Sequence, residues 1–196
     1  VVSVTPSVVP SVSINLTPGS NPSCAGTLLA FTASPVNGGS SPSYQWKVNG
    51  SNVGTNSNTF TSSTLTNGQI VTCELTSNAT CASPTQVTSN GITINIITVV
   101  TPSVSIALTT GTNPSCSGSS LTFTATPVNG GASPSYQWKI NGTNAGTNSP
   151  TFSTTALSNG QVVTCEMTSN AICVTTSTAT SSGITMIINP VLTPSV

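Results

Sequence analysis

The chain has 196 residues, and only 2% of them are charged, where roughly 25% is usual for soluble domains. Two lysines and two glutamates give a formal net charge of zero, and arginine, aspartate and histidine do not occur. Such a composition excludes most enzyme chemistry, any carboxylate-rich calcium site and neutralisation of a nucleic-acid backbone. We therefore expect no enzyme, no catalytic residue, no metal, no cofactor and no nucleic-acid partner. The hydrophobic fraction of 35% is nevertheless enough to predict a folded chain.

Two copies of one repeat make up the sequence, and their offset is 92 residues throughout. The anchors of the first copy are Cys24, Trp46, Cys73 and Cys81, which recur as Cys116, Trp138, Cys165 and Cys173. A Thr-Pro-Ser-Val motif occurs at 5–8, 101–104 and 193–196. We therefore expect a piece of a longer tandem array. Its parts would be the tail and junction of a preceding repeat at 1–10, repeat 1 at 11–100, repeat 2 at 101–192 and the start of a next repeat at 193–196.

Apolar residues alternate with polar ones along each copy, with the period of a half-buried strand. In chain order, the predicted strands of the first copy are 11–16, 28–34, 43–48, 58–64, 69–76 and 85–97, with equivalents 92 residues later. Clusters of Asn, Gly and Pro separate them, as in antiparallel sandwiches. The sequence thus predicts an all-β fold of two tandem Ig-like antiparallel β-sandwich modules, arranged end to end. Phe31 and Trp46 are expected in the first core, and Phe123 and Trp138 in the second.

Three motifs with fixed spacing carry a family resemblance. They are Asn21-Pro22-Ser23-Cys24, Tyr44-Gln45-Trp46-Lys47 and Thr76-Ser77-Asn78-Ala79, with their equivalents in the second copy. Together they resemble the Ig-like or PKD-like tandem repeats of giant bacterial surface adhesins of Bacteroidetes, of the gliding-motility type exported by type IX secretion. The resemblance implies an extracellular, cell-surface protein. It says little about the ligand, because such repeats are reused as spacers.

Each copy contains three cysteines, so they cannot all pair within one module. Cys73 and Cys165 fall on the apolar faces of their strands and are predicted to be buried free thiols, with an inter-chain or other bridge as the alternative. The other four lie in polar loops. The resemblance implies the pairs Cys24–Cys81 and Cys116–Cys173, although in a regular Ig topology these two loops lie at opposite ends. Disulfides would indicate an oxidising, extracellular setting.

The four charged residues are predicted to form two cross-strand ion pairs on the outer faces, Lys47 with Glu74 and Lys139 with Glu166. Each lies on a strand with the parity opposite to that of the core residues. The alternative is an isopeptide bond from Lys47 to an asparagine, assisted by Glu74.

We interpret the chain as a structural segment of the stalk or shaft of a long extracellular repeat adhesin or surface filament, which would extend an adhesive tip from the cell. The junction supports this interpretation, because an apolar strand runs into residues 101–104 without a Gly/Ser linker. The expected partners are neighbouring repeats of the same chain. A further hypothesis is that identical chains bundle side by side into a multi-chain fibre, against an inert monomeric stalk. The alternative function is a carbohydrate- or surface-binding Ig-like module, which an exposed Tyr44 and Trp46 pair would favour. Direct insertion into a membrane is not expected, because no apolar run approaches roughly 18 residues.

Overall fold

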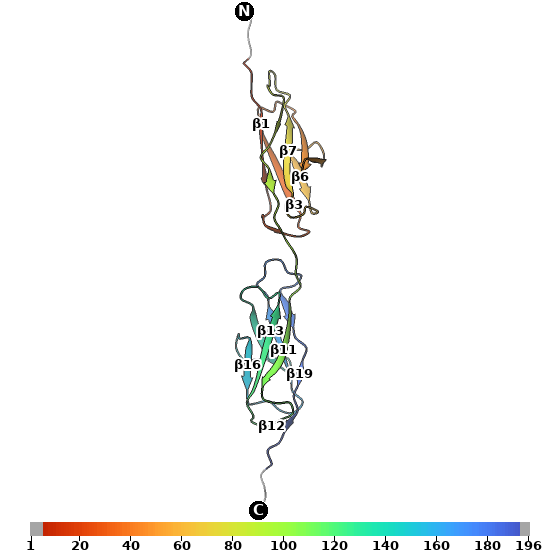
Figure 1. Ribbon diagram of the computed structural model, residues 1–196. Helices are drawn as coiled ribbons and strands as arrows, with labels where there is room; N and C mark the ends of the chain where they lie inside the picture. The colour runs from red at the N-terminus through yellow and green to blue at the C-terminus, as the bar shows by residue number, and fades with distance from the viewer. Residues whose placement is uncertain (1–5, 193–196) are drawn as a thin grey trace, which may run out of the picture. The chain divides into compact units, whose positions relative to one another are not determined.

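Residues 6–192 are described in the computed structural model (Figure 1). The described chain is all-β and contains no helix. It divides between Thr98 and Val99 into two compact units, called unit 1 and unit 2. The parts of the expected junctions at 1–5 and 193–196 lie outside the described residues.

Within residues 6–192, each unit contains ten strands, and the strands of unit 2 follow those of unit 1 in the same order. Unit 1 contains β1 (Ser11–Leu16), β2 (Ser23–Cys24), β3 (Leu29–Val36), β4 (Ser43–Val48), β5 (Ser51–Val53), β6 (Thr59–Ser62), β7 (Ile70–Thr76), β8 (Gln86–Thr88), β9 (Ile92–Thr93) and β10 (Ile96–Ile97). Unit 2 contains β11 (Ser103–Thr110), β12 (Ser115–Cys116), β13 (Leu121–Val128), β14 (Ser135–Ile140), β15 (Thr143–Ala145), β16 (Thr151–Thr154), β17 (Val162–Thr168), β18 (Thr178–Thr180), β19 (Ile184–Thr185) and β20 (Ile188–Asn189).

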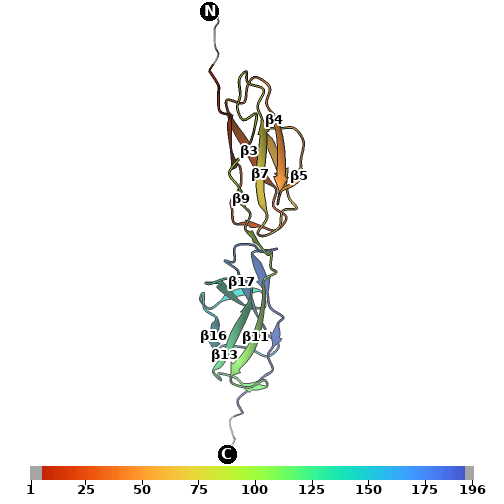
Figure 2. The ribbon, with the colours of Figure 1, turned by 45° about the horizontal axis from the view of Figure 1, so that its top comes forward.

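Two antiparallel sheets pack face to face in each unit, as Figure 2 shows for unit 1. In unit 1 their strand orders are β1-β3-β6 and β5-β4-β7-β8, and β9 also pairs with β7. Unit 2 repeats both sheets as β11-β13-β16 and β15-β14-β17-β18. This is the arrangement of strands A, B and E against C′, C, F and G in an immunoglobulin-like sandwich. The prediction of two tandem Ig-like β-sandwich modules is therefore confirmed.

The core of unit 1 forms where the inward-facing residues of the two sheets meet. Phe31 on β3 lies opposite Phe60 on β6, and Trp46 on β4 lies opposite Cys73 on β7. Phe31, Trp46 and Cys73 are 0% exposed, and so are their equivalents in unit 2. Alternation with period 2 is sufficient to bury these residues, because successive side chains on a strand point to opposite faces.

The last predicted strand, 85–97, is interrupted in the structure. Between β8 and β9 the side chain of Asn90 turns to the other sheet, where its Oδ1 accepts a hydrogen bond from Ile14 N (2.9 Å) and its Nδ2 donates to Ile14 O (3.2 Å). This contact joins the two sheets at their edge. Unit 2 is interrupted at the same place, between β18 and β19, although Ser182 stands at the position of Asn90.

Each unit has an entrance end, where its first strand begins, and an exit end, where its last short strand finishes. At the entrance end of unit 1, Val8 N donates to Cys81 O (3.1 Å) and Ser83 N donates to Val8 O (3.0 Å). At its exit end, β10 pairs in parallel with β2, and Ala25 N donates to Ile97 O (3.0 Å). Backbone pairing with a loop thus fixes the chain at both ends of the sandwich.

Candidate functional site

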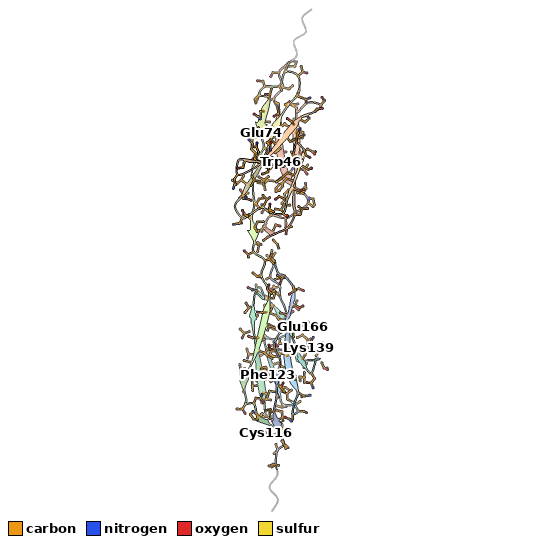
Figure 3. The ribbon with its side chains drawn as sticks, turned by 90° about the vertical axis from the view of Figure 1, so that its right-hand side faces the viewer. Trp46, Glu74, Cys116, Phe123, Lys139 and Glu166 are labelled. Atoms are coloured by element: carbon orange, nitrogen blue, oxygen red, sulfur yellow. The ribbon has the colours of Figure 1, made fainter. Side chains whose placement is uncertain are left out.

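The charged residues of each unit lie on the outer face of its five-stranded sheet. Lys47 Nζ is 2.6 Å from Glu74 Oε2 in unit 1, and Lys139 Nζ is 2.7 Å from Glu166 Oε2 in unit 2. Figure 3 shows the second pair on neighbouring strands. Gln86 Nε2 also donates to the Glu74 carboxylate, so both carboxylate oxygens have a partner. The charges of each pair therefore compensate one another within the unit.

Solvent reaches these ion pairs. The side chains of Lys47 and Glu74 are 25% and 21% exposed. Partly exposed pairs of this kind contribute under about 1 kcal/mol to stability. The isopeptide alternative requires a dry, apolar site, and the Lys47 ammonium instead bonds a carboxylate at the surface.

The tryptophans are the residues on which a carbohydrate-binding face would depend. Trp46 is 0% exposed, and its Nε1 donates to Ser57 O at 2.8 Å. The centroid of its ring lies 5.7 Å from the ring centroid of Phe60 and 6.3 Å from that of Phe31. Trp138 repeats this arrangement, with its own hydrogen bond to Ser149 O. The indole rings are thus core groups and have no free face on which a sugar could stack.

The strand cysteines are buried thiols in the core. Cys73 and Cys165 are free and 0% exposed. The pKa of each thiol is raised from 9.0 to about 11, mainly because burial disfavours the charged thiolate and also because of the neighbouring carboxylate of Glu74 or Glu166. Both groups therefore remain protonated near neutral pH, and the thiolate needed for disulfide exchange or metal binding is scarce.

The implied disulfides Cys24–Cys81 and Cys116–Cys173 are wrong. Cys81 and Cys116 are exposed free thiols, whereas Cys24 and Cys173 are disulfide-bonded. Within one unit the two loop cysteines lie at opposite ends, as the regular Ig topology suggested. Cys24 is in β2 beside the exit strand, and the carbonyl of Cys81 bonds Val8 at the entrance.

The length of a sandwich separates these two ends. β7 crosses unit 1 from the turn at Asn67, which bonds Ile96 N near the exit, to the loop at Asn78, which bonds Gly38 O near the entrance. Its seven residues span about 20 Å at 3.3 Å per residue. A disulfide needs Cα atoms within about 7 Å, so no bond can form between the two ends.

Figure 3 places Cys116 at one end of unit 2, away from the core residue Phe123. Its loop is tied to the exit strand, because β12 pairs in parallel with β20 and Ser117 N donates to Asn189 O (2.8 Å). Cys173 lies at the other end, where its carbonyl accepts a hydrogen bond from Val100 N (2.9 Å). Unit 2 thus repeats the placement found in unit 1.

Asparagine side chains hold the loops at both ends, a role that the sequence analysis did not assign. At the exit end, Asn21 Nδ2 donates to Thr93 O (2.6 Å), and its Oδ1 accepts from Asn95 N (2.8 Å). At the entrance end, Asn37 Nδ2 donates to Val9 O (2.8 Å) and Asn78 Oδ1 accepts from Ser41 N (3.0 Å).

All three asparagines have equivalents that make the corresponding bonds in unit 2, namely Asn113, Asn129 and Asn170. The signal was present in the sequence: these loop asparagines recur at the offset of 92 residues even where neighbouring residues differ.

A shallow hollow of about 320 Å³ opens on unit 1. It is lined by Val48, Val53, Phe60, Ser62, Thr64, Leu65 and Gln69. None of these residues is charged, and the polar groups are two hydroxyls and one amide. Among residues 6–192, no three His, Cys, Asp or Glu side chains gather into a possible metal site, and no helix is long and apolar enough to cross a membrane.

No known protein family matches the chain, and no curated protein matches it either. Among solved structures, it is similar to the full ectodomain (Ig1–Ig3) of mouse nectin-like molecule 4, with 12% identity and a TM-score of 0.36 over 91% of this chain. The chain spans 64% of the length of that ectodomain. It is also similar to the fibronectin(III)-like modules of Clostridium thermocellum CbhA, with 13% identity, a TM-score of 0.37 and coverage of 92% of this chain and 95% of that one.

Proposed function

We propose that the chain is a load-bearing segment of the stalk of a long extracellular repeat protein, of the kind that extends an adhesive tip from a bacterial surface. The observation that carries the proposal is the way each unit fixes its chain at the entrance and exit ends. β10 in unit 1 and β20 in unit 2 are each paired in parallel with a loop strand. Because the connecting hydrogen bonds run across the strands, a pull along the chain loads them together in shear instead of opening them one at a time.

Three further observations support a structural role over a binding role. The tryptophans are buried, the ion pairs are compensated within the unit, and the loops are fastened by asparagines that recur in both units. The disulfide-bonded cysteines indicate an oxidising, extracellular setting.

Single-molecule pulling tests the proposal. In reducing buffer, we expect two unfolding events, each releasing on the order of 300 Å of chain. Ala25→Pro removes the N–H that donates to Ile97 O, so it should lower the unfolding force of one event, while the unmodified unit 2 serves as the internal reference. Unfolding of both units at negligible force would contradict the load-bearing role.

The alternative is a module that binds carbohydrate or a surface, for which the hollow beside Phe60 is the available feature. A glycan array and a cell-binding assay with the isolated chain separate the two functions. A stalk segment should bind nothing in either assay. Saturable binding that Gln69→Ala abolishes would favour the binding module instead.

The proposal includes side-by-side association of identical chains into a fibre. With two ion pairs as its charged groups, the surface consists largely of hydroxyl, amide and backbone groups, which can contact one another without desolvating ions. Weak lateral contacts would recur every 92 residues and accumulate along an array. The native fibre should then keep its width when salt is raised. Isolated strands one module wide, or a bundle that salt dissolves, would contradict lateral association.

A further inference from the structure

The loop cysteines occupy two kinds of position, defined within one unit by backbone hydrogen bonds. Cys24 and Cys116 are exit-end cysteines, because each lies in a two-residue strand that pairs with the last strand of its unit. Cys81 and Cys173 are entrance-end cysteines, because the carbonyl of each accepts a hydrogen bond from the first paired residue of its unit. The repeat thus carries one cysteine at each of its ends.

The two repeats differ in the state of these cysteines although the positions are equivalent. The bonded cysteines are one of each kind, the exit-end Cys24 and the entrance-end Cys173. The thiols are also one of each kind, the exit-end Cys116 and the entrance-end Cys81. Each thiol therefore has, in the other repeat, an equivalent that is disulfide-bonded. This internal comparison shows that both positions can form disulfides in this fold.

Burial changes along with bonding. Cys173 is only 3% exposed, whereas its equivalent Cys81 is exposed. The local hydrogen bonds do not account for this difference, because Val8 N bonds the carbonyl of Cys81 as Val100 N bonds that of Cys173. Cys81 also has a φ of 61°, in the left-handed region that non-glycine residues rarely adopt.

Neither Cys81 nor Cys116 can form a disulfide with another cysteine of its own unit. The sandwich separates the entrance-end from the exit-end position by about 20 Å, and the remaining cysteines, Cys73 and Cys165, are buried in the cores. A disulfide partner for Cys81 or Cys116 must therefore lie outside its own unit.

We propose that Cys81 and Cys116 are inter-repeat disulfide sites, at which an exit-end cysteine of one repeat bonds an entrance-end cysteine of the next. Every junction of an array would then carry one covalent cross-link in addition to the peptide chain. In each bond two thiols lose two protons and two electrons. These pass to a disulfide oxidant, such as oxidised glutathione or a dithiol–disulfide oxidoreductase, which is reduced to two thiols.

The inference does not depend on the stalk role, because it concerns only how repeats of this kind are linked. Its test is a three-repeat chain, made by inserting a second copy of residues 101–192 after residue 192. The protein is oxidised with oxidised glutathione, its exposed thiols are alkylated in the native state, and its peptides are mapped by mass spectrometry without reduction. Cys116, which reacts in the two-repeat chain, should now be protected and linked to the third repeat's counterpart of Cys173. Cys81 should still react.

A matched variant replaces that counterpart in the third repeat with serine. In this variant Cys116 should again be alkylated, to the same extent as in the two-repeat chain. The proposal is overturned if Cys116 of the three-repeat chain is alkylated as completely as Cys81. It is equally overturned if Cys116 carries only glutathione, or if it remains protected in the serine variant.

Discussion

Replacing Gly39 by alanine should damage the entrance end of unit 1 far more than the same change at Gly50. Both glycines have a left-handed φ, +86° at Gly39 and +80° at Gly50, so alanine pays a backbone cost of about 1–2 kcal/mol at either position. A Cβ at Gly50 would meet nothing within 4 Å. A Cβ at Gly39 would collide with the Asn78 side chain and lie 2.6 Å from Ala79 N.

The additional cost follows from the bonds that the displaced loop makes. Asn78 Oδ1 accepts from Ser41 N and Asn78 N donates to Gly38 O, both at 3.0 Å. Each neutral hydrogen bond contributes about 0.5–1.5 kcal/mol, so Gly39→Ala should cost about 2–5 kcal/mol in total. Urea denaturation of both variants in reducing buffer measures the difference.

Hydrogen exchange should locate the damage in the loop at 77–82 for Gly39→Ala and leave that loop unchanged for Gly50→Ala. Unit 2 offers a replicate, because Gly131 and Gly142 have the same two environments. Equal losses of stability for Gly39→Ala and Gly50→Ala would refute the reasoning, since the steric clash would then contribute nothing.

Asn21→Ala should lower the free energy of unfolding by about 1–2 kcal/mol and speed amide exchange at the exit end, because it removes two hydrogen bonds. Asn52→Ala is the control: this side chain is exposed and makes no hydrogen bond among the described residues. It should be nearly neutral in the same denaturation assay. The free energy of unfolding should fall between pH 9 and 11, because the unfolded thiol of Cys73 ionises near 9.0 while burial holds its folded pKa at about 11. Cys73→Ala should remove on the order of 2 kcal/mol of this loss of unfolding free energy between pH 9 and 11. An unchanged pH dependence in the variant would contradict the assignment to Cys73. Lys47→Met should cost under about 1 kcal/mol, and 1 M NaCl should shrink that loss if the ion pair with Glu74 is its source.

The main strands could be predicted from the sequence because their information is local. Alternation around Trp46 and Cys73 identifies the two central strands and their inward faces, and the structure has β4 at the predicted residues 43–48. The two-residue β2 and the three-residue β5 contain too few residues for a period to show. At the break after β8, Cys73 N donates to the side chain of Ser89, 16 residues away, and Cys165 N donates to Ser181 Oγ in the same way in unit 2. Alternation along one strand does not encode such a contact between strands.

The cysteine pairing was mispredicted for a different reason. The family resemblance implied a bond between Cys24 and Cys81. Spacing along the chain carries no information on which end of a sandwich a loop occupies. A regular Ig topology, by contrast, predicts that the two loops lie at opposite ends of the sandwich. The structure agrees, since the β2–β10 pairing and the bond from Val8 N to Cys81 O place the two cysteines at opposite ends.

The near-absence of charge and the recurrence of loop asparagines have a common physical consequence. An asparagine amide both donates and accepts, so one side chain can bond two backbone groups of another segment, as Asn21 does with Thr93 O and Asn95 N. An ionised side chain would hold the same loop through a bond that salt weakens, whereas a neutral amide bond is little affected by ionic strength. The ends of both units therefore depend on contacts that stay constant when external salt changes. The stability of this chain should accordingly vary little between low and high ionic strength.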